Sequence, residues 1–471
     1  MSTDIRDIMI SYDLPLNRSK ESVYDFLFAH YKKYVDALHE SILDLKHKDF
    51  PEKFYRFLRD SALSAIETEC DMILEVLSLD KTFRPDAMRT SFGELMKFMN
   101  NSQLPMLREV AIDGRLLRIR AGTEPFVRSE LFHIPFQKRG RISSQRYSIQ
   151  GHPCLYLSGS FRPLLFGGSE SNLLLCWIEC GMPMTFYASV FETQKPLKIL
   201  HFAKSATQYL SEYKKAKDET ERQDRRTSIM QYLMSYPLRA ACSIQVMSKT
   251  TSFVEEYIIP QLLLAWVREN DNYNGISYQT AAAISPHIEY HSFNLVLPAK
   301  NIDLSDGFCT ELKELFKLTD PQKFNMCERI LYFEPQIDKV RNYVLSLGEK
   351  LKKSEANSLH PYRHILSLCS LFLSACSMLA DESNTSADIP YQIFHGVSCS
   401  AFIVYKSIKN TSSAEDWVAQ YKSIKANVLS PDDISEVLDP FCDVCGVFHD
   451  LLNRPFPPLE GAGVFSLVGG I

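Results

Sequence analysis

The chain has 471 residues, of which 45% are hydrophobic and 23% are charged, as in ordinary folded proteins. Its 52 Lys and Arg against 57 Asp and Glu give a net charge of −5 at pH 7, without the basic excess that proteins binding nucleic acid or anionic lipid usually carry. The 29 Phe and 22 Tyr provide ample apolar surface for a core, which excludes a disordered chain.

Residues 1–125 are expected to form a helical N-terminal domain. Hydrophobic side chains recur at steps of three and four over residues 23–42, which places them on one face of a helix. Two more helices are expected over 54–79 and 91–99, with a break at Pro85. The first 15 residues contain acidic side chains and no long apolar run, so we expect no secretory signal and a cytoplasmic location.

Residues 126–335 are expected to form an α+β domain with a mixed or antiparallel sheet. Short runs rich in β-branched and aromatic residues, separated by Gly, Pro and Ser, are typical of strands. These runs are 153–160, 184–191, 197–203, 241–247 and 293–300. The charged stretch 211–226 predicts a solvated helix or surface loop, and residues 253–268 predict a further helix that contains Pro260 or breaks there.

Residues 336–471 are expected to form a helical C-terminal region, with helices over 340–352, 360–379 and 413–428. The most apolar stretch, Ile365–Ala380, is shorter than the roughly 20 residues that a membrane helix needs, and it contains Ser and Cys. It therefore predicts a buried helix and no membrane association.

Two motifs have simpler explanations than the chemistry they suggest. Cys442 and Cys445 with His449 have a spacing that zinc ligands use, but no second Cys-x-x-Cys completes a tetrahedral site, so we expect core thiols and no metal. The twelve cysteines show no disulfide-type spacing and are expected to be reduced. The pair Gly167-Gly168 lacks the pattern of a phosphate-binding loop and predicts only a turn.

A cluster of cationic residues precedes the strand at 153–160. Lys138, Arg139, Arg141 and Arg146 stand just before Gly151. Guanidinium groups match phosphate oxygens in bidentate geometry, so this segment is a candidate pyrophosphate-binding site. The alternative is a basic surface hairpin with no ligand.

The same segment resembles a known family. The run from Arg146 to Tyr156, RYSIQGHPCLY, resembles the opening signature of the RES domain, R-[WY]-[NS]-x-x-G-x-x-x-L-Y. Residues 176–183, CWIECGMP, are similar to the helix that carries the family's Glu, at Glu179. Residues 255–280 resemble the helix and strand that lead to the family's Ser. The resemblance extends over about residues 126–325.

The resemblance implies an NAD⁺-degrading enzyme. RES proteins have a compact α+β core similar to that of ADP-ribosyltransferase toxins, here flanked by the two helical regions. They cleave the bond between nicotinamide and ribose, with water, phosphate or a protein as acceptor. NAD⁺ is then a substrate, no further cofactor is expected, and a bacterial toxin of this type implies a protein inhibitor or antitoxin as partner.

The family's functional residues match particular positions of this chain. Arg146 is expected to anchor the pyrophosphate, with Arg139 and Arg141 as further phosphate contacts. Tyr156 offers a flat face for nicotinamide or a hydroxyl for the ribose. Glu179 is expected to stabilise the positive charge that develops on the ribose as nicotinamide leaves.

Two departures from the family pattern leave alternatives open. The spacing between Tyr156 and Glu179 is longer than usual, which makes Glu170 a rival for the acidic role. The family's Ser corresponds to Thr280, which keeps the hydroxyl, and Ser277 is a second stand-in. Besides NAD⁺ cleavage, the chain is compatible with a protein ADP-ribosyltransferase or with a non-catalytic interaction protein that retains a degenerate RES fold.

Overall fold

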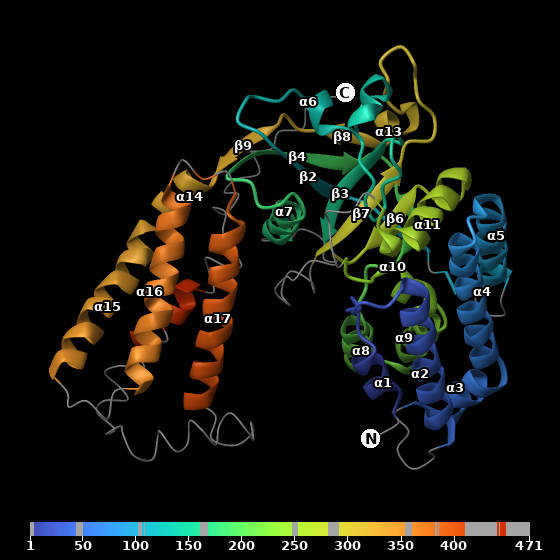
Figure 1. Cartoon of the computed structure of the whole chain (residues 1–471), viewed down its shortest axis with the longest axis horizontal. Helices are drawn as coiled ribbons and strands as arrows, with labels where there is room; N and C mark the ends of the chain where they lie inside the picture. Colours follow the sequence, from blue (N-terminus) through green and yellow to red (C-terminus); the bar gives the residue numbers. More distant parts are fainter. Residues whose placement is uncertain are drawn as a thin grey trace.

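The structure is a computed structural model. It describes residues 4–43, 50–101, 106–107, 109–160, 168–246, 253–280, 292–353, 360–381, 384, 386–409, 440–441 and 443–448. Figure 1 shows a β-sheet at the top of the molecule, with one group of helices below each of its ends. The expected α+β class is confirmed, with a mixed sheet that is largely antiparallel.

The helices that precede the first strand cluster at one side of the molecule. They are α1 (Ile5–Ser11), α2 (Val23–Leu43), α3 (Glu52–Phe57), α4 (Leu63–Lys81) and α5 (Pro85–Asn101). Val23, Leu27, Tyr31, Tyr34 and Leu38 of α2 are buried, as the predicted apolar face requires. A π-helical turn over Leu58–Ala62 joins α3 to α4.

The strands form one nine-stranded sheet in the order β1-β5-β6-β7-β3-β2-β4-β8, with β9 also paired to β4. The strands are β1 (Glu109–Ile112), β2 (Arg115–Ala121), β3 (Cys154–Ser160), β4 (Thr185–Thr193), β5 (Leu197–His201), β6 (Gly275–Tyr278), β7 (Ser292–Pro298), β8 (Phe316–Leu318) and β9 (Gln322–Asn325). Only β5 and β6 run parallel among these described pairs.

The sheet begins earlier than the sequence pattern predicts. Residues 109–121 were expected to be helical and instead form β1 and β2. β1 pairs with β5 and β2 with β4, so the two strands lie along one long antiparallel ribbon that bends at Gly114, where φ is +117°. A strand was also expected over 241–247, but helix α10 (Tyr236–Cys242) reaches into this range instead.

The bent ribbon divides the sheet into two halves that share a core. One half is β1-β5-β6-β7-β3 and the other is β2-β4-β8 with β9. Buried apolar side chains from both halves form a single cluster, which includes Leu116, Leu157, Phe191, Leu295 and Phe316. The sheet therefore folds around its own core, as a twisted sheet with a strong bend does.

The N-terminal helices share a core with the helices that lie between the later strands. Those helices are α8 (Ala206–Lys215), α9 (Glu219–Met234), α10 and α11 (Ile258–Glu269). One cluster joins them to α1–α5 and to Leu200, Ile276 and Val296 of the sheet. The charged stretch 211–226, predicted to be a solvated helix or a surface loop, contains the end of α8, a short non-helical link at 216–218 and the start of α9. Pro260 falls in the first turn of α11, where a missing N–H has no cost.

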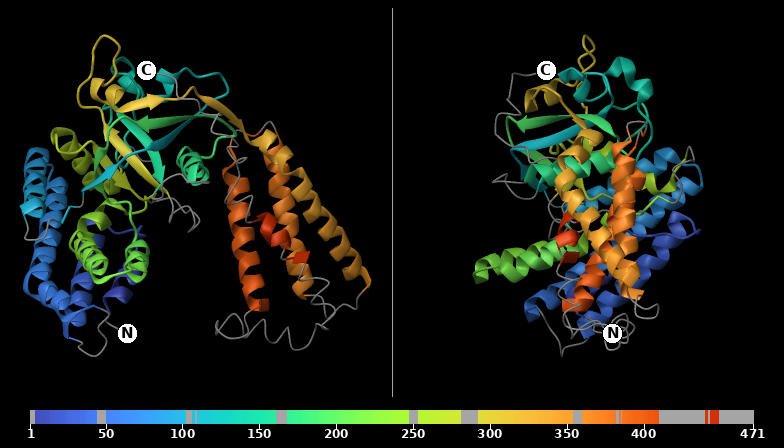
Figure 2. Two further views of the ribbon diagram at one scale, coloured as in Figure 1. Left: turned by 180° about the vertical axis from the view of Figure 1, so that it is seen from behind. Right: turned by 90° about the vertical axis from the view of Figure 1, so that its left-hand side faces the viewer.

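The C-terminal helices pack at the other end of the sheet, against α7 (Gly168–Glu179). They are α14 (Met326–Tyr332), α15 (Glu334–Lys353), α16 (His360–Ala380) and α17 (Asp388–Lys409). Figure 2 shows the last three side by side in both views. The expected helices at 340–352 and 360–379 are confirmed, α17 was not foreseen, and residues 413–428 lie outside the described residues.

The apolar stretch Ile365–Ala380 belongs to α16 and supplies Leu368, Phe372 and Leu379 to the core. Among the helices described, none has both the length and the apolarity needed to cross a bilayer. The ten cysteines whose side chains the structure describes carry free thiols.

Candidate functional site

A cavity of about 700 Å³ lies where the two half-sheets part. β2 and β3 are neighbours in the sheet but pair only at Leu117 and Ser158, whereas each pairs over seven positions with its other neighbour. Helix α7 contacts β2, β3 and β7 at this split. The volume is in the range of small-molecule and cofactor sites, which makes this cavity the candidate functional site.

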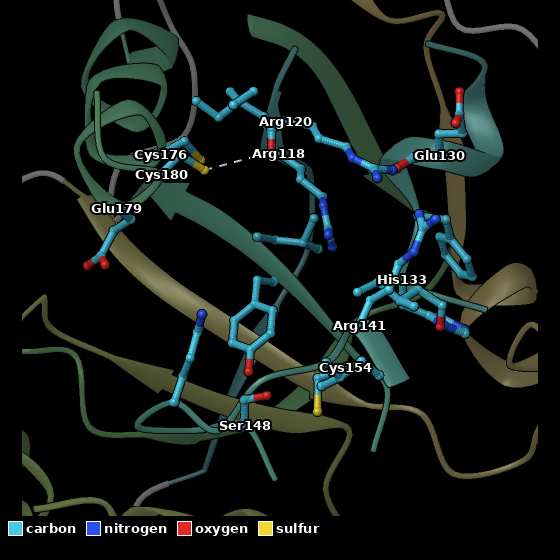
Figure 3. A pocket seen from close by; sticks show the side chains of 18 of the residues that line it. Arg118, Arg120, Glu130, His133, Arg141, Ser148, Cys154, Cys176, Glu179 and Cys180 are labelled. Atoms are coloured by element: carbon cyan, nitrogen blue, oxygen red, sulfur yellow. Dashed lines mark hydrogen bonds between the residues drawn. The ribbon is translucent and has the colours of Figure 1, made fainter. Parts of the chain in front are cut away.

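The lining of the cavity is rich in charge. Four cationic side chains and two carboxylates contribute to it, namely Arg118, Arg120, Lys138, Arg141, Glu130 and Glu179. Figure 3 shows Glu179 on α7 at one side, Arg141 and Glu130 at the opposite side, and Arg118 between them. The excess of positive charge favours an anionic ligand.

Arg118 is the cation that most strongly indicates a ligand. Its Nη1 atom is buried and has no hydrogen-bond partner among the described residues. Burial lowers the pKa of Arg118, and the charge of nearby Arg120 contributes to the shift. A buried guanidinium nitrogen without a partner is costly, and an anion in the cavity would supply the missing partner.

Arg120 lies two residues along β2 and is partly engaged. Its Nη1 donates a hydrogen bond to the carbonyl oxygen of Glu130 at 2.7 Å, and its guanidinium lies 5.0 Å from the ring centroid of Phe126. Both arginines project from the strand that parts from β3.

Glu179 is the last residue of α7 and is exposed to the cavity. The negative end of a helix is an unfavourable place for a carboxylate. Asn294 of β7 compensates, because its Nδ2 donates a hydrogen bond of 2.7 Å to Glu179 Oε1. Asn294 is itself buried, so it fixes one carboxylate oxygen and leaves the other available to a ligand.

Tyr156 lies in the same cavity, on β3. Its hydroxyl donates to the carbonyl oxygen of Tyr147 at 2.7 Å, and burial raises its pKa well above the ordinary value. The hydroxyl therefore stays protonated and its hydrogen is committed to the main chain. What Tyr156 offers a ligand is chiefly its aromatic face.

His133 and Cys154, which also line the cavity, are neutral near pH 7. Burial lowers the pKa of His133 to about 4. Its Nε2 accepts a hydrogen bond from the Cys309 N–H, so Nδ1 carries the proton and donates to the Ile134 carbonyl oxygen. Burial raises the pKa of Cys154 to about 11, so it does not form a thiolate nucleophile.

Arg146 does not line the cavity. Its guanidinium donates to the carbonyl oxygens of Cys242 and Ile244, at 2.8 and 2.5 Å, and lies 5.9 Å from the Tyr257 ring centroid. Arg146 thus joins the turn before β3 to the end of α10.

Replacement of Arg146 by alanine is expected to lower the free energy of unfolding by about 2 kcal/mol, as loss of hydrogen bonds from a charged donor to buried acceptors implies. Arg146→Lys should recover only part of this, because lysine cannot make the same forked contact. Chemical denaturation measures both. An alanine variant of normal stability that binds its ligand more weakly would instead return Arg146 to the role of anion anchor.

The remaining predicted site residues are dispersed. Arg139 is exposed outside the cavity, with its guanidinium 4.6 Å from the Phe136 ring centroid. Thr280 is buried and does not contribute to the lining. Ser277 is fully buried, and its Oγ lies 2.8 Å from His201 Nδ1. Glu170 belongs to α7, but the placement of its side chain is outside the description.

The structure thus brings Glu179, Tyr156 and Arg141 together and separates them from Arg139, Arg146 and Thr280. No group of metal-ligating side chains occurs among the described residues, while Cys442 and His449 fall outside them.

Sequence reasoning missed Arg118, Arg120 and Asn294. A signal for the arginines exists in the run RLLRIRA at 115–121, where Arg118 and Arg120 share one face if the segment is a strand. Assigning this run to a helix concealed that alternation. Asn294 has no comparable signal, because only the fold brings β7 beside the end of α7.

The fold and the site define an α+β protein with a ligand-sized, cationic cavity at a split in its sheet. No protein-family model matches the chain, and no solved structure matches it. Among curated proteins, the "Putative toxin YopC" of Bacillus subtilis (strain 168) is 31% identical over 327 residues, which span 66% of this chain and 68% of the relative. The chain belongs to the family of this Bacillus subtilis protein.

Proposed function

We propose that the protein is an NAD⁺-consuming enzyme of the RES type that cleaves the bond between nicotinamide and ribose. The observation that carries this proposal is the single cavity shared by Arg118, Arg141, Tyr156 and Glu179. A dinucleotide requires cations for its pyrophosphate, an aromatic face for a base and a carboxylate near the ribose. The cavity offers all three.

The positive and negative side chains of the cavity suit different parts of NAD⁺. The pyrophosphate carries two negative charges, which Arg118 and the exposed Arg141 would bind as forked donors. The nicotinamide end carries a positive charge on its ring, which suits the side where Glu179 lies. This assignment moves the phosphate anchor from Arg146 to Arg118.

The reaction needs little from the protein beyond position and charge. The C1′–N bond breaks and its electron pair goes to the ring nitrogen, which releases neutral nicotinamide. The oxocarbenium-like ribose that forms is stabilised by the Glu179 carboxylate. Water then adds to C1′ and loses a proton, which gives ADP-ribose, nicotinamide and H⁺. With phosphate as acceptor, the product is ADP-ribose 1″-phosphate.

The name of the Bacillus subtilis relative supports a bacterial toxin as the setting. Loss of NAD⁺ stops growth, and a cell that makes such an enzyme needs a means to restrain it. We therefore include a protein inhibitor or antitoxin as the expected partner.

The proposal is tested by incubating the purified full chain with NAD⁺ and quantifying nicotinamide and ADP-ribose by chromatography over time. Stoichiometric release of both is expected. Nicotinamide released together with ADP-ribosylated protein, detected by mass spectrometry, would favour the transferase. Unchanged NAD⁺ together with the absence of growth arrest on expression would contradict the proposal and favour an interaction protein.

Substitution of Asn294 tests the role of the Glu179 carboxylate through the pH dependence of the reaction rate. Asn294→Asp would set a second carboxylate within hydrogen-bond distance of Glu179, so one of the pair holds its proton to higher pH. Because the reaction needs Glu179 ionised, the pH below which the rate falls should rise by about 1 to 2 pH units.

The nearly isosteric Asn294→Leu variant serves as the control. It removes the donor without adding charge, so it should lower kcat and displace the pH profile less than Asn294→Asp does. Coincident pH profiles for wild type and Asn294→Asp would remove Glu179 from the rate-determining chemistry.

A further inference from the structure

The turn that follows Glu179 is held by the C-terminal region. Helix α7 ends with hydrogen bonds from the Gly181 N–H to Ile178 O at 3.0 Å and from the Met182 N–H to Trp177 O at 2.8 Å. Gly181 has φ +78°, as this kind of helix end requires. The carbonyl oxygens of Gly181 and Met182 then face the segment that leads into α17.

Hydrogen bonds from side chain and backbone join that segment to the turn. Ser386 Oγ donates to Gly181 O at 3.2 Å and, at the longer distance of 3.5 Å, to Met182 O, and the Ala387 N–H donates to Met182 O at 2.7 Å. Ser386 also forms an antiparallel bridge with Pro183. These contacts lie within a few residues of the proposed catalytic carboxylate.

The aromatic rings behind the turn reinforce the same connection. Trp177 of α7 packs edge-on against Tyr391 of α17, with ring centroids 5.5 Å apart and planes at 84°. The indole N–H of Trp177 donates to Pro183 O at 2.9 Å. Both rings are almost completely buried, so α7 and α17 form one packed unit.

The backbone of the turn shows that it needs such support. Met182 has φ +52°, a left-handed conformation that residues with a side chain rarely adopt. Conformations of this kind persist only where the surroundings impose them, and they concentrate at functional sites. The imposing contacts here come from Trp177 on one side and Ala387 on the other.

We propose that Ser386 and Tyr391 are positioning residues that hold the turn at Gly181–Met182 and thereby fix Glu179 in the cavity. The C-terminal helices are then a required part of the catalytic unit. This inference rests on the proposed function, because it concerns the position of the carboxylate that the reaction uses.

Substitutions at Ser386 separate positioning from helix capping. The Ser386 hydroxyl also accepts a hydrogen bond from the Asp388 N–H at 3.2 Å, which caps α17. Ser386→Asp keeps the acceptor for that cap but lacks the donor for Gly181, Ser386→Ala lacks both, and Ser386→Thr keeps both. Ser386 is exposed, so none of these changes disturbs the core.

The full chain with each substitution is assayed for NAD⁺ cleavage. Ser386→Ala and Ser386→Asp should each lower kcat about fivefold, as loss of one neutral hydrogen bond implies, with KM for NAD⁺ unchanged. Ser386→Thr should resemble wild type. A loss confined to Ser386→Ala would assign the effect to the cap of α17 and overturn the proposal.

Tyr391 gives a second matched pair. Its hydroxyl is buried and has no hydrogen-bond partner among the described residues, so Tyr391→Phe should behave as wild type. Tyr391→Leu removes the ring contact to Trp177 and should lower kcat with KM unchanged. Equal activity of the phenylalanine and leucine variants would contradict the role of this ring.

Amide hydrogen exchange of the peptide 177–184 tests the contact without reference to activity. Faster exchange is expected in Ser386→Asp and Tyr391→Leu than in Ser386→Thr and Tyr391→Phe. Unchanged exchange in all four variants overturns the inference.

If wild type leaves NAD⁺ intact while exchange responds as expected, the proposed function fails but the structural contact stands. If exchange rises while kcat is unaffected, the contact exists but does not position Glu179, which also overturns the inference.

Discussion

Glu179→Gln is expected to lower kcat for NAD⁺ cleavage by about 10³-fold, the usual consequence of removing a charge that stabilises a transition state. The amide keeps the shape of the side chain and can accept from Asn294 through its oxygen, so the local structure is preserved. Affinity for NAD⁺ should be largely retained, because the amide loses only the charge attraction to the nicotinamide end while the proposed phosphate contacts remain. Nicotinamide release and calorimetric binding measure the two effects separately.

Glu130 supplies the matched control for this variant. It is the other carboxylate of the cavity, and its Oε2 accepts a hydrogen bond from the Val127 N–H at 3.1 Å on the opposite side. Glu130→Gln should retain near-normal kcat. If Glu130→Gln loses activity and Glu179→Gln does not, the reacting ribose binds at the other side of the cavity.

Arg118→Leu is expected to weaken NAD⁺ binding about 10²-fold and to raise thermal stability at the same time. The affinity loss follows from truncating a buried charge that would pair with phosphate. The gain in stability follows because the buried Nη1 has no partner in the absence of ligand, so its desolvation is uncompensated. Opposite signs of the two effects distinguish a ligand-binding arginine from a structural one.

Arg139→Gln is the control for Arg118, because Arg139 is exposed outside the cavity. It should change neither affinity nor stability. Calorimetry and thermal unfolding measure both variants. An Arg118→Leu protein that is destabilised and binds NAD⁺ normally would show that this guanidinium serves the fold alone.

The hydrophobic periodicity of the sequence predicted those helices that bury one apolar face against the core. The apolar face of α2 and the buried stretch in α16 follow from periodicity alone, and both are confirmed. The helical prediction for Arg115–Ala121 was wrong because this strand borders a cavity. Arginines therefore occupy positions where a strand usually buries apolar side chains. Helix and strand are hardest to tell apart from sequence where residues line a binding cavity and not an apolar core.

The candidate site was predictable where residue types stand near each other in the sequence, and unpredictable where the fold decides. Tyr156 and Glu179, which the motif singles out, both line one cavity. Arg146 has the same chemistry as Arg118, but its guanidinium binds main-chain carbonyls of α10 and beyond, nearly 100 residues away. Nothing in the local sequence distinguishes an arginine that binds backbone from one that binds a ligand.

A crystal structure of the Glu179→Gln variant soaked with NAD⁺ would decide whether the cavity is the NAD⁺ site, because the variant should bind the dinucleotide without cleaving it. We expect the pyrophosphate against Arg118 in the cavity between the half-sheets, with the nicotinamide ribose beside residue 179 and Tyr156. NAD⁺ bound elsewhere on the protein, with the cavity occupied only by solvent at saturating NAD⁺, would contradict it.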